Sequence, residues 1–542
     1  MHNDHSKLNQ SLLSWLNSTA ALIACISCIG IFYIGTLVDG QNWSGDFSHY
    51  LHHAINIVEG RNYSDTQYLV NSIGFFVGPY NYPPIYPILL APVYWCFGFD
   101  LEAFKWVSNL SFLAALWFAA LCFQKRLTLN ILLPVLLIAL NPYLWGFRNN
   151  ILSDFTFTAF CFLALYLMLA YFEREEQASY DLKQQLLHSI LIGVCCYLAY
   201  GTREIGIVAP LTFIAYDIVG RRKLSLASVV VTGTFISLAM LQSHLLSESF
   251  VPQYIQDNLS KLAHERSSVS ISHTKWISTD PAAIMERVKT YRWALQNFIP
   301  EHSGNGAITS LLVTVSKILF NLTTLLALIG YIRCLLLKLS VLEIFLAGYI
   351  SVLLLFGAPA TVRYLIPVFP FLVYYSFIAF QWASNLINKR TLVIGVAGYS
   401  LMTGLVYVTS MASASYERFE KGITHQQAEE MFDYIRKQTN TNDSIVFRKP
   451  RVMSLYTGRT SAAYPNPETD IPNLIDNYFD AIEGDYYVDM NLEDWMLPLE
   501  DSAPPSAQFQ QVFRNTYFAI YRYSPGGNSN GEASNSQPKI LP

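Results

Sequence analysis

The feature that most constrains this chain is a series of apolar segments that recurs from residue 17 to residue 412. A helix of about 20 apolar residues crosses the hydrocarbon core of a bilayer, which is about 30 Å thick. Because no water there can satisfy the backbone, such segments must be helical. The sequence therefore predicts an α-helical polytopic membrane protein with about eleven spans. The spans are expected near residues 17–38, 104–124, 128–146, 152–172, 186–202, 204–220, 224–246, 308–336, 341–358, 364–386 and 391–412.

The composition agrees with a membrane protein. Only 14% of the residues are charged and 52% are hydrophobic, whereas soluble domains carry about 25% charged residues. The 34 Tyr and 34 Phe suit wide membrane interfaces, where aromatic rings collect. The net charge of −4 is small and indicates no nucleic-acid partner. All eight cysteines lie within or beside apolar segments, so neither a disulfide framework nor a thiolate metal site is indicated.

The basic residues between the spans indicate the orientation. If the N-terminus is cytoplasmic, every connection on that side is basic, as the positive-inside rule requires. An odd number of spans then places the C-terminal region outside. One apolar stretch, residues 83–98, has three prolines in its first half, and we expect a helix in the outer interface there rather than a full span. The basic connections contain Lys125–Arg126, Arg174 and Lys183, Arg221–Lys223, Arg333 and Lys338, and Lys389–Arg390.

The sequence divides into three predicted parts. Residues 1–412 form a transmembrane domain with large outer loops at 39–105 and 247–306. Residues 413–523 form a small extracytoplasmic α/β domain, because helical periodicity over HQQAEEMFDYIRKQ is followed by the strand-like runs SIVF, YYVDM and YFAIYRY. Residues 524–542 are rich in Gly, Ser, Asn and Pro and predict a disordered tail.

Asp46 is the first candidate for chemistry, because it follows the first span closely and begins a plausible helix. Tyr50 and His53 lie on roughly the same face of that helix and are candidate substrate-binding residues. A carboxylate there suits a general base that takes a proton from an acceptor hydroxyl. The alternative is that Asp46 only caps the helix and favours its dipole.

Further ionisable residues lie at the outer ends of predicted spans. Asp154 begins the fourth span just after Arg148, and an acidic side chain entering an apolar helix is costly unless it faces a protein cavity. Arg203 and Glu204 occupy a very short outer turn, and Arg363 lies at another outer boundary. Arginine suits bidentate phosphate recognition, so the three arginines are candidate phosphate ligands and Glu204 a candidate substrate contact. An ion pair within the turn, or snorkelling toward lipid headgroups, is the alternative.

The motifs that mark other enzyme classes are absent. The chain has no G-x-x-x-x-G-K-[ST] loop, no G-x-S-x-G and no H-E-x-x-H. We predict no cofactor and no metal ligands, with a divalent metal as the open alternative because several histidines lie on the outer side but their spacing is not diagnostic. These histidines are His49, His52, His53, His264 and His273.

Five motifs in order resemble the membrane glycosyltransferases of the GT-C class, in particular the bacterial branch related to protein O-mannosyltransferases and to the lipid A aminoarabinose transferase. The likeness covers about residues 10–412. The motifs are D-x-x-x-Y-x-x-x-A-x-x-x-x-x-G-x-x-Y starting at Asp46, then YPPIYPILLAPVYWCFG, LSD at the fourth span, the TREIG turn and VRYLIPVFP.

The resemblance implies a GT-C-like fold and transfer of a hexose or pentose from a polyprenyl-phosphate donor to a lipid, glycan or protein acceptor. It places the reaction on the periplasmic face of a bacterial inner membrane, with inversion at the anomeric carbon. Asp46 would be the catalytic acid/base, Asp154 matches a second acidic position and is the second candidate catalytic residue, and Arg203 and Arg363 would contact the donor phosphate. Phe47 stands where the protein mannosyltransferases have a second acidic residue, which weakens the case for a protein acceptor.

Three other functions stay open at this point. A secondary transporter would show inverted repeats and ionisable groups near the midplane, whereas the charges here cluster at outer ends. A polysaccharide polymerase or ligase would use a diphosphate-linked glycan. In a noncatalytic scaffold the outer charges would only cap helices. For the transferase we expect one outward-facing cavity lined by Asp46, Asp154, Arg203 and Arg363.

Overall fold

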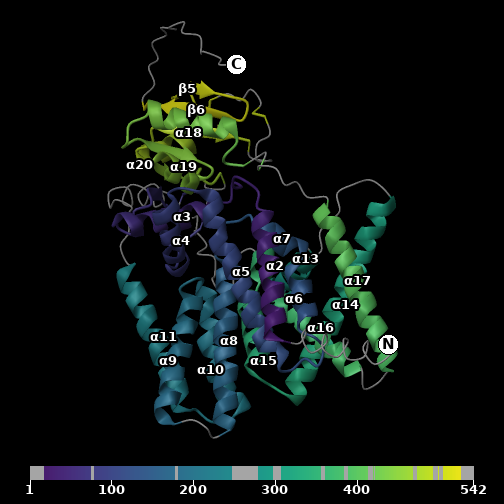
Figure 1. The fold of residues 1–542 in the computed structure, drawn as a ribbon. Coiled ribbons are helices and arrows are strands. Elements are labelled where there is room, and N and C mark those ends of the chain that lie inside the picture. Colours follow the sequence, from purple (N-terminus) through teal and green to yellow (C-terminus); the bar gives the residue numbers. More distant parts are fainter. Residues whose placement is uncertain are drawn as a thin grey trace, which may run out of the picture. The chain divides into compact units, whose positions relative to one another are not determined.

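In the computed structural model the chain folds into two compact units, each built from segments that are far apart in the sequence (Figure 1). The helical unit comprises Met1–Leu37, Ala103–Ser243 and Thr274–Tyr416. The mixed unit comprises Val38–Glu102, His244–His273 and Glu417–Pro542. Most of the predicted outer loop 247–306, with His264 and His273, and most of the predicted tail lie outside the described residues. The structure describes residues 18–71, 73–74, 78–177, 181–246, 279–296, 307–355, 361–383, 388–412, 419, 422–467, 473–491, 498–499 and 504–525.

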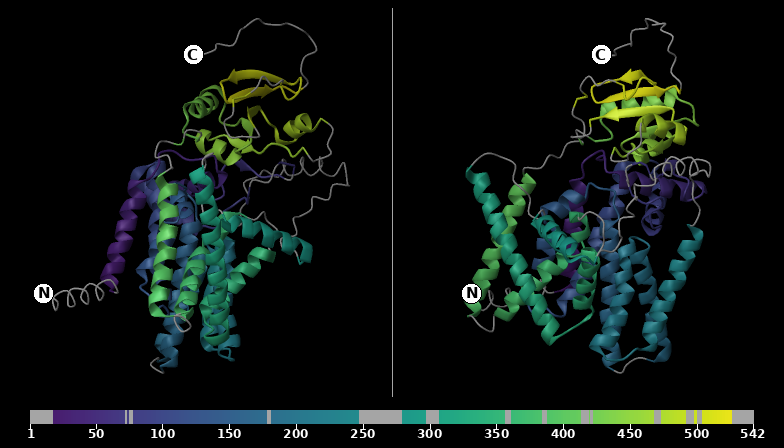
Figure 2. Two further views of the ribbon diagram at one scale, coloured as in Figure 1. Left: turned by 90° about the vertical axis from the view of Figure 1, so that its right-hand side faces the viewer. Right: turned by 180° about the vertical axis from the view of Figure 1, so that it is seen from behind.

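Each predicted span contains helix, and the chain is a helical membrane protein. In the described ranges, six helices are long and apolar enough to cross a membrane, and the longest run side by side (Figures 1 and 2). The other predicted spans hold shorter or interrupted helices, so the count of eleven stays a prediction. The six are α5 (Leu101–Gln124), α8 (Asp154–Glu176), α9 (Leu182–Tyr200), α11 (Leu226–Leu245), α14 (Ala307–Leu337) and α17 (Lys389–Ala412). The others are α2 (Thr19–Gly35), α6 (Leu132–Ala139) with α7 (Pro142–Phe147), η1 (Glu204–Ile207) with α10 (Val208–Ala215) and η2 (Tyr216–Gly220), α15 (Val341–Leu355), and η3 (Val362–Leu365) with α16 (Phe369–Ala383).

The break between α6 and α7 has a local cause. Pro142 has no backbone N–H, so it continues no helix from α6 but suits the first position of α7. Asn141 caps α7 by accepting hydrogen bonds from the backbone N–H groups of Tyr143 at 3.1 Å and Leu144 at 3.3 Å. The short helix that results ends at Phe147, and its C-cap is Arg148, one of the predicted site residues.

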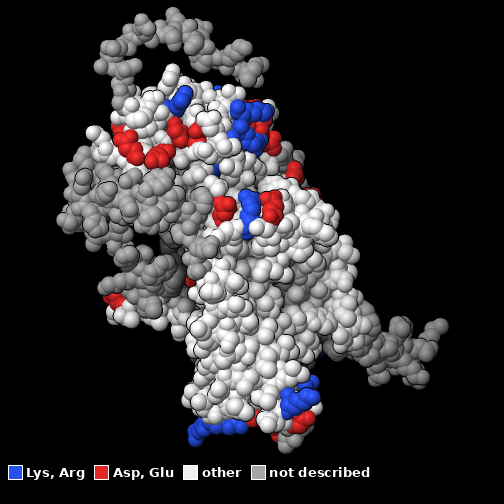
Figure 3. All heavy atoms as spheres, turned by 90° about the vertical axis from the view of Figure 1, so that its left-hand side faces the viewer, with Lys and Arg blue, Asp and Glu red and all other residues white. Residues whose placement is uncertain are grey.

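The charges on the helical unit follow the pattern of a membrane protein. On the face shown in Figure 3, a broad band over the helices is uncharged, and cations gather beyond its lower end. The predicted cytoplasmic connection after η2 is held by ion pairs: Arg221 contacts Glu175 at 2.6 Å and Asp217 at 3.0 Å, and Lys223 contacts Glu175 at 2.9 Å. These pairs hold a basic turn at a helix end, and Arg221 compensates the carboxylate of the fully buried Asp217.

The mixed unit combines short helices with a six-stranded sheet in the order β1-β3-β2-β4-β6-β5. The first four strands in that order are parallel, and β6 is antiparallel to both of its neighbours. The strand-like runs of the sequence are β2, β4 and β6, and the periodic stretch is α18. The elements are α3 (Gly45–Glu59), β1 (Tyr68–Leu69), α4 (Ile85–Phe97), α18 (Gln426–Gln438), β2 (Ser444–Phe447), α19 (Pro450–Thr457), β3 (Thr460–Ala462), α20 (Leu474–Ile482), β4 (Tyr486–Met490), β5 (Phe509–Arg514) and β6 (Phe518–Tyr523).

Strand β1 joins the predicted first outer loop to the C-terminal sheet. It pairs in parallel with β3, with Tyr68 opposite Ser461, and Asn71 donates to the hydroxyl of Tyr478 at 2.8 Å. The two regions therefore belong to one folded unit. The predicted domain boundary at residue 412 had assigned them to different domains. A two-residue strand is too short to show the alternation that sequence analysis relies on.

Helix α4 covers the ambiguous stretch, residues 83–98. Its 13 residues extend about 20 Å at 1.5 Å per residue, which is less than the roughly 30 Å of a hydrocarbon core. Pro92 lies inside it. The helix is too short to cross a bilayer alone, in agreement with the expectation that these residues do not form a full span.

Candidate functional site

Three predicted site residues meet in the helical unit. Asp154 is the first residue of α8, and its side chain is only 2% exposed. Its Oδ1 atom accepts a hydrogen bond from Nη1 of Arg203. Its Oδ2 atom accepts from Nε of Arg363 at 3.3 Å and from Nη2 at 3.1 Å. One buried carboxylate thus joins two arginines from distant parts of the chain.

Interruptions between helices place these side chains together. Asp154 follows the N-cap Ser153, Arg203 has an extended backbone between α9 and η1, and Arg363 lies in η3 before α16. The turn at Arg203 is so tight that a Cβ atom on Gly206 would lie 2.4 Å from the backbone nitrogen of Tyr200. Only glycine fits there, which gives the glycine of the TREIG motif a structural reason.

The Arg203–Asp154–Arg363 cluster is partly exposed through its two arginines. It contains two guanidinium groups and one carboxylate, and the arginine side chains are 17% and 26% exposed. Arg203 also lies over the ring of Tyr364, with its Cζ atom 5.2 Å from the ring centre. Guanidinium groups that are partly exposed at helix ends suit bidentate recognition of a phosphate.

Arg148 and Glu204, the other two predicted site residues of this unit, make different contacts. Arg148 is 1% exposed, and its guanidinium donates to the backbone carbonyls of Thr36 (3.0 Å from Nε) and Trp145 (2.7 Å from Nη1). It therefore satisfies the ends of α2 and α7, and this geometry does not support a phosphate contact by Arg148. Glu204 is exposed at the start of η1, and Arg203 pairs with Asp154 instead of with Glu204.

Asp46 lies in the mixed unit, in the first turn of α3, and 26% of its side chain is exposed. Its Oδ1 atom accepts a hydrogen bond from the hydroxyl of Tyr82 at 2.8 Å. The Nη1 atom of Arg451 lies 3.7 Å from the same oxygen. Ser44 is the N-cap of α3, so Asp46 is not the capping residue.

Sequence analysis missed Tyr82 and Arg451. Tyr82 stands in the YPPIYP motif, where its hydroxyl gave no signal among many tyrosines. Arg451 comes from α19 in the C-terminal region, 405 residues after Asp46 in the numbering of the chain, and only the pairing of the two regions brings it near. Burial, and to a lesser degree Asp46, holds the pKa of Tyr82 well above its usual value, so this hydroxyl keeps its proton.

Tyr50 and His53 are buried in the mixed unit at 2% and 0% exposure. Tyr50 packs against the rings of Tyr82 and Tyr86, with centroids 4.5 Å and 5.0 Å away. The His53 ring stacks on Tyr63 at 4.0 Å and its Nδ1 atom contacts the Tyr63 carbonyl at 2.8 Å. These contacts make both residues part of the core, which does not support direct substrate binding.

The three histidines of α3 are buried as neutral rings. Burial lowers the pKa of His52 and of His53 to about 3 and that of His49 well below its usual range. Among the described residues, no group of three or more His, Cys, Asp or Glu side chains is arranged to hold a metal ion. The structure thus gives these histidines a packing role.

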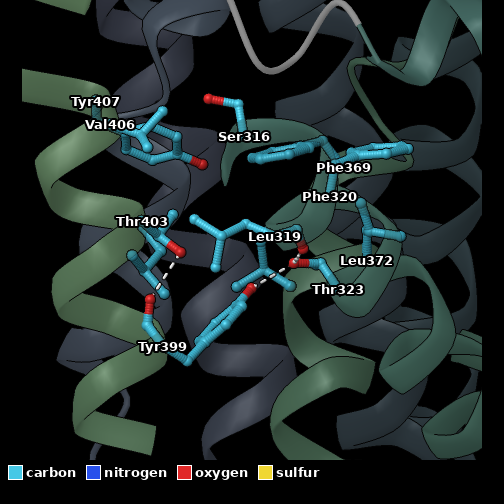
Figure 4. Close-up of a pocket in the computed structure, with 12 residues that line it drawn as sticks. Ser316, Leu319, Phe320, Thr323, Phe369, Leu372, Tyr399, Thr403, Val406 and Tyr407 are labelled. Atoms are coloured by element: carbon cyan, nitrogen blue, oxygen red, sulfur yellow. Dashed lines mark hydrogen bonds between the residues drawn. The ribbon is translucent and has the colours of Figure 1, made fainter. Parts of the chain in front are cut away.

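A separate small cavity lies among α6, α14, α16 and α17 (Figure 4). Its volume of about 30 Å³ has room for one or two water molecules. Its lining is mostly apolar, with the hydroxyls of Thr323 and Tyr399 hydrogen-bonded at 2.7 Å. None of the predicted site residues lines it.

Comparison with known proteins extends these observations. No protein-family model and no curated protein sequence matches the chain. The oligosaccharyltransferase of Archaeoglobus fulgidus, in complex with zinc and sulfate, has a TM-score of 0.57 at 13% identity, over 86% of this chain and 67% of that one. Archaeal AglB from the same organism, with an inhibitory peptide and a dolichol-phosphate, has a TM-score of 0.57 at 12% identity, over 86% of this chain and 69% of that one. ArnT from Cupriavidus metallidurans, bound to undecaprenyl phosphate, has a TM-score of 0.52 at 12% identity, over 94% of this chain and 98% of that one.

Both kinds of neighbour are GT-C glycosyltransferases of membranes. Their likeness to this chain extends over most of its length, and their low identity means that it is the backbone architecture that is shared. The chain therefore has the fold of the GT-C membrane glycosyltransferases.

Proposed function

We propose that this protein is a glycosyltransferase that moves a sugar from a polyprenyl-phosphate carrier to a lipid, glycan or protein acceptor, with inversion, on the periplasmic face of a bacterial inner membrane. The observation that carries this proposal is the Arg203–Asp154–Arg363 cluster, a partly exposed pair of guanidinium groups at helix ends. Solved structures with the same fold were bound to dolichol-phosphate and undecaprenyl phosphate, which supports a lipid phosphate as the carrier.

In this mechanism Arg203 and Arg363 bind the donor phosphate. When the bond between the anomeric carbon and the phosphate oxygen breaks, its electron pair stays on that oxygen. The growing negative charge is stabilised by fixed guanidinium groups. Asp154 holds the two arginines in position rather than taking a proton, since each of its oxygens already accepts from one of them.

Asp46 is the proposed general base. The acceptor hydroxyl attacks the anomeric carbon and passes its proton to the carboxylate of Asp46. The partial exposure of Asp46 leaves the group accessible, and the Tyr82 hydroxyl keeps one carboxylate oxygen in a defined place. A single displacement of this kind inverts the anomeric configuration.

The test uses purified protein in liposomes with a panel of labelled polyprenyl-phosphate sugars. We expect labelled acceptor and released polyprenyl phosphate in equal amounts, and a strong loss of both in Arg203→Ala and Arg363→Ala. Arg333→Ala is a matched control, because this arginine lies over Trp382 in a predicted cytoplasmic connection.

The rival functions give different results in the same preparation. Movement of the sugar compound across the liposome membrane without transfer would identify a transporter and overturn the proposal. Turnover of diphosphate-linked glycans alone would identify a polymerase or ligase, and would also overturn the assignment of a monophosphate carrier.

A further inference from the structure

Arg451 is a buried cation with an unusual set of contacts. Its side chain is 1% exposed, and Nη2 donates to the Pro79 carbonyl at 2.6 Å while Nη1 donates to the Tyr82 hydroxyl at 3.1 Å. Its Cζ atom lies 5.0 Å from the ring centre of Tyr68 and 5.2 Å from that of Tyr82. Burying a guanidinium costs free energy because the charge loses its hydration. A buried arginine that contacts a side-chain hydroxyl therefore needs an explanation other than packing alone.

Arg459 shows what a structural arginine looks like in the same region. It is 8% exposed, and its Nη atoms donate to the backbone carbonyls of Thr457, Arg436 and Thr439 at 3.0–3.1 Å. These bonds close turns and helix ends, and they lead to no titratable group. Arg451 differs because its Tyr82 contact continues to the carboxylate of Asp46.

The direction of this chain of hydrogen bonds is fixed by chemistry. A guanidinium has donors and no acceptor, so the Tyr82 oxygen must accept from Arg451. The single hydroxyl proton of Tyr82 is then directed to Oδ1 of Asp46 at 2.8 Å. The order is Arg451 to Tyr82 to Asp46, and every donor in it favours the ionised carboxylate.

We propose that Arg451 and Tyr82 are positioning residues for Asp46: through the Tyr82 hydroxyl, the C-terminal region holds the carboxylate in one orientation and in its ionised form. The inference rests on the proposed role of Asp46 as the general base. It gives the C-terminal region a part in the reaction, because α19 supplies the cation.

The backbone around Arg451 is shaped to admit it. Gly78 has φ +117°, and a Cβ atom there would lie 2.7 Å from Nη2 of Arg451. A side chain at this position would be strained and would displace the guanidinium. The loop before Tyr82 therefore depends on glycine to let Arg451 reach the tyrosine.

The groups that act on Asp46 define what a pH titration will report. They include Tyr82 and Arg451, by the contacts above, and Lys449, the N-cap of α19, by its charge. Burial and Arg448 lower the pKa of Lys449 to about 8, and the Tyr82 hydroxyl stays protonated. The low-pH side of the rate profile therefore reports on Asp46.

The experiment compares the pH dependence of kcat for the full-length wild type, Tyr82→Phe and Arg451→Lys, with Arg459→Lys as the matched control. Loss of a donor disfavours the carboxylate, so we expect the acid limb of Tyr82→Phe to move up by about one pH unit. Arg451→Lys should shift it in the same direction, because lysine keeps the charge but loses the forked contact. Arg459→Lys should lower thermal stability and leave the limb in place.

Two results separate this inference from the proposed function. If Asp46→Asn transfers sugar normally, the general-base role itself is lost, and the positioning role with it. If Asp46→Asn is inactive but the acid limb of both folded variants stays at the wild-type pH, only the positioning role is overturned. Tyr82→Phe keeps the ring that packs on Tyr50. It therefore tests the positioning role by itself if Arg451→Lys fails to fold.

Discussion

Arg363 donates two hydrogen bonds to the Oδ2 atom of Asp154, from Nε at 3.3 Å and from Nη2 at 3.1 Å, although the two residues are 209 positions apart. The contact fastens η3 to the start of α8. A planar guanidinium can make both bonds at once, whereas an ammonium cannot reproduce this fork. Because Arg203 occupies the other oxygen, the carboxylate sets the spacing of two cations.

Arg363→Lys should therefore weaken binding of the carrier phosphate. A hydrogen bond to a charged group contributes about 1.5–3 kcal/mol, so the Kd for undecaprenyl phosphate should rise roughly 10- to 100-fold. The measurement is a titration of the purified variant in detergent micelles with undecaprenyl phosphate. Arg148→Lys is the control, because its carbonyl contacts hold α2 and α7: it should lower the Tm without changing this affinity. An equal loss of affinity in both variants would argue against a specific phosphate contact.

Asp46→Asn should reduce turnover and preserve donor binding. Asparagine has a similar shape but does not act as a base, and general-base catalysis contributes about 10²–10⁴-fold. The comparison needs kcat and the Kd for the donor on the same preparation. Asp65→Asn, on the loop after α3 where its carboxylate accepts from Gln67 at 2.7 Å, is the control and should keep the wild-type rate. Wild-type turnover in Asp46→Asn would leave Asp46 a structural residue.

Acid should destabilise the protein through the histidines of α3. Burial holds the pKa of His52 and of His53 at about 3 in the folded state, below the ordinary value of 6.5. Between these values the unfolded chain binds more protons, so stability present above pH 6.5 is lost as the pH falls. The expected loss at about pH 5 is about 2 kcal/mol for each histidine. Thermal unfolding of wild type and of His52→Gln should show a shallower pH dependence in the variant, and identical slopes would contradict the assignment.

Lys449 should make the stability rise with pH on the alkaline side as well. Burial and the charge of Arg448 lower its pKa from 10.5 to about 8, against the influence of Asp46. Between these values the unfolded chain again binds more protons, so stability rises with pH in this window. Lys449→Met removes the cost of the buried charge: its Tm should be higher than that of wild type near pH 7 and should rise less up to about pH 10. Lys437→Met, whose lysine is exposed, should keep the wild-type slope.

The sequence by itself determined the helical membrane architecture, and the reason is local. A run of apolar residues predicts its own helix, because each segment in the bilayer must satisfy its backbone hydrogen bonds internally. It also placed Asp154, Arg203 and Arg363 at the ends of apolar helices. The motif order then indicated the GT-C fold, which the solved neighbours share.

Only the tertiary structure decided what these side chains touch. The sequence grouped Arg148 with the phosphate ligands, but its guanidinium closes the ends of two helices. The sequence also left Arg451 among ordinary polar residues, although the mixed unit directs it through Tyr82 to Asp46. The partners of a buried charge depend on which distant segments come into contact in the fold. Hydropathy and periodicity are local properties of the sequence and do not predict those contacts.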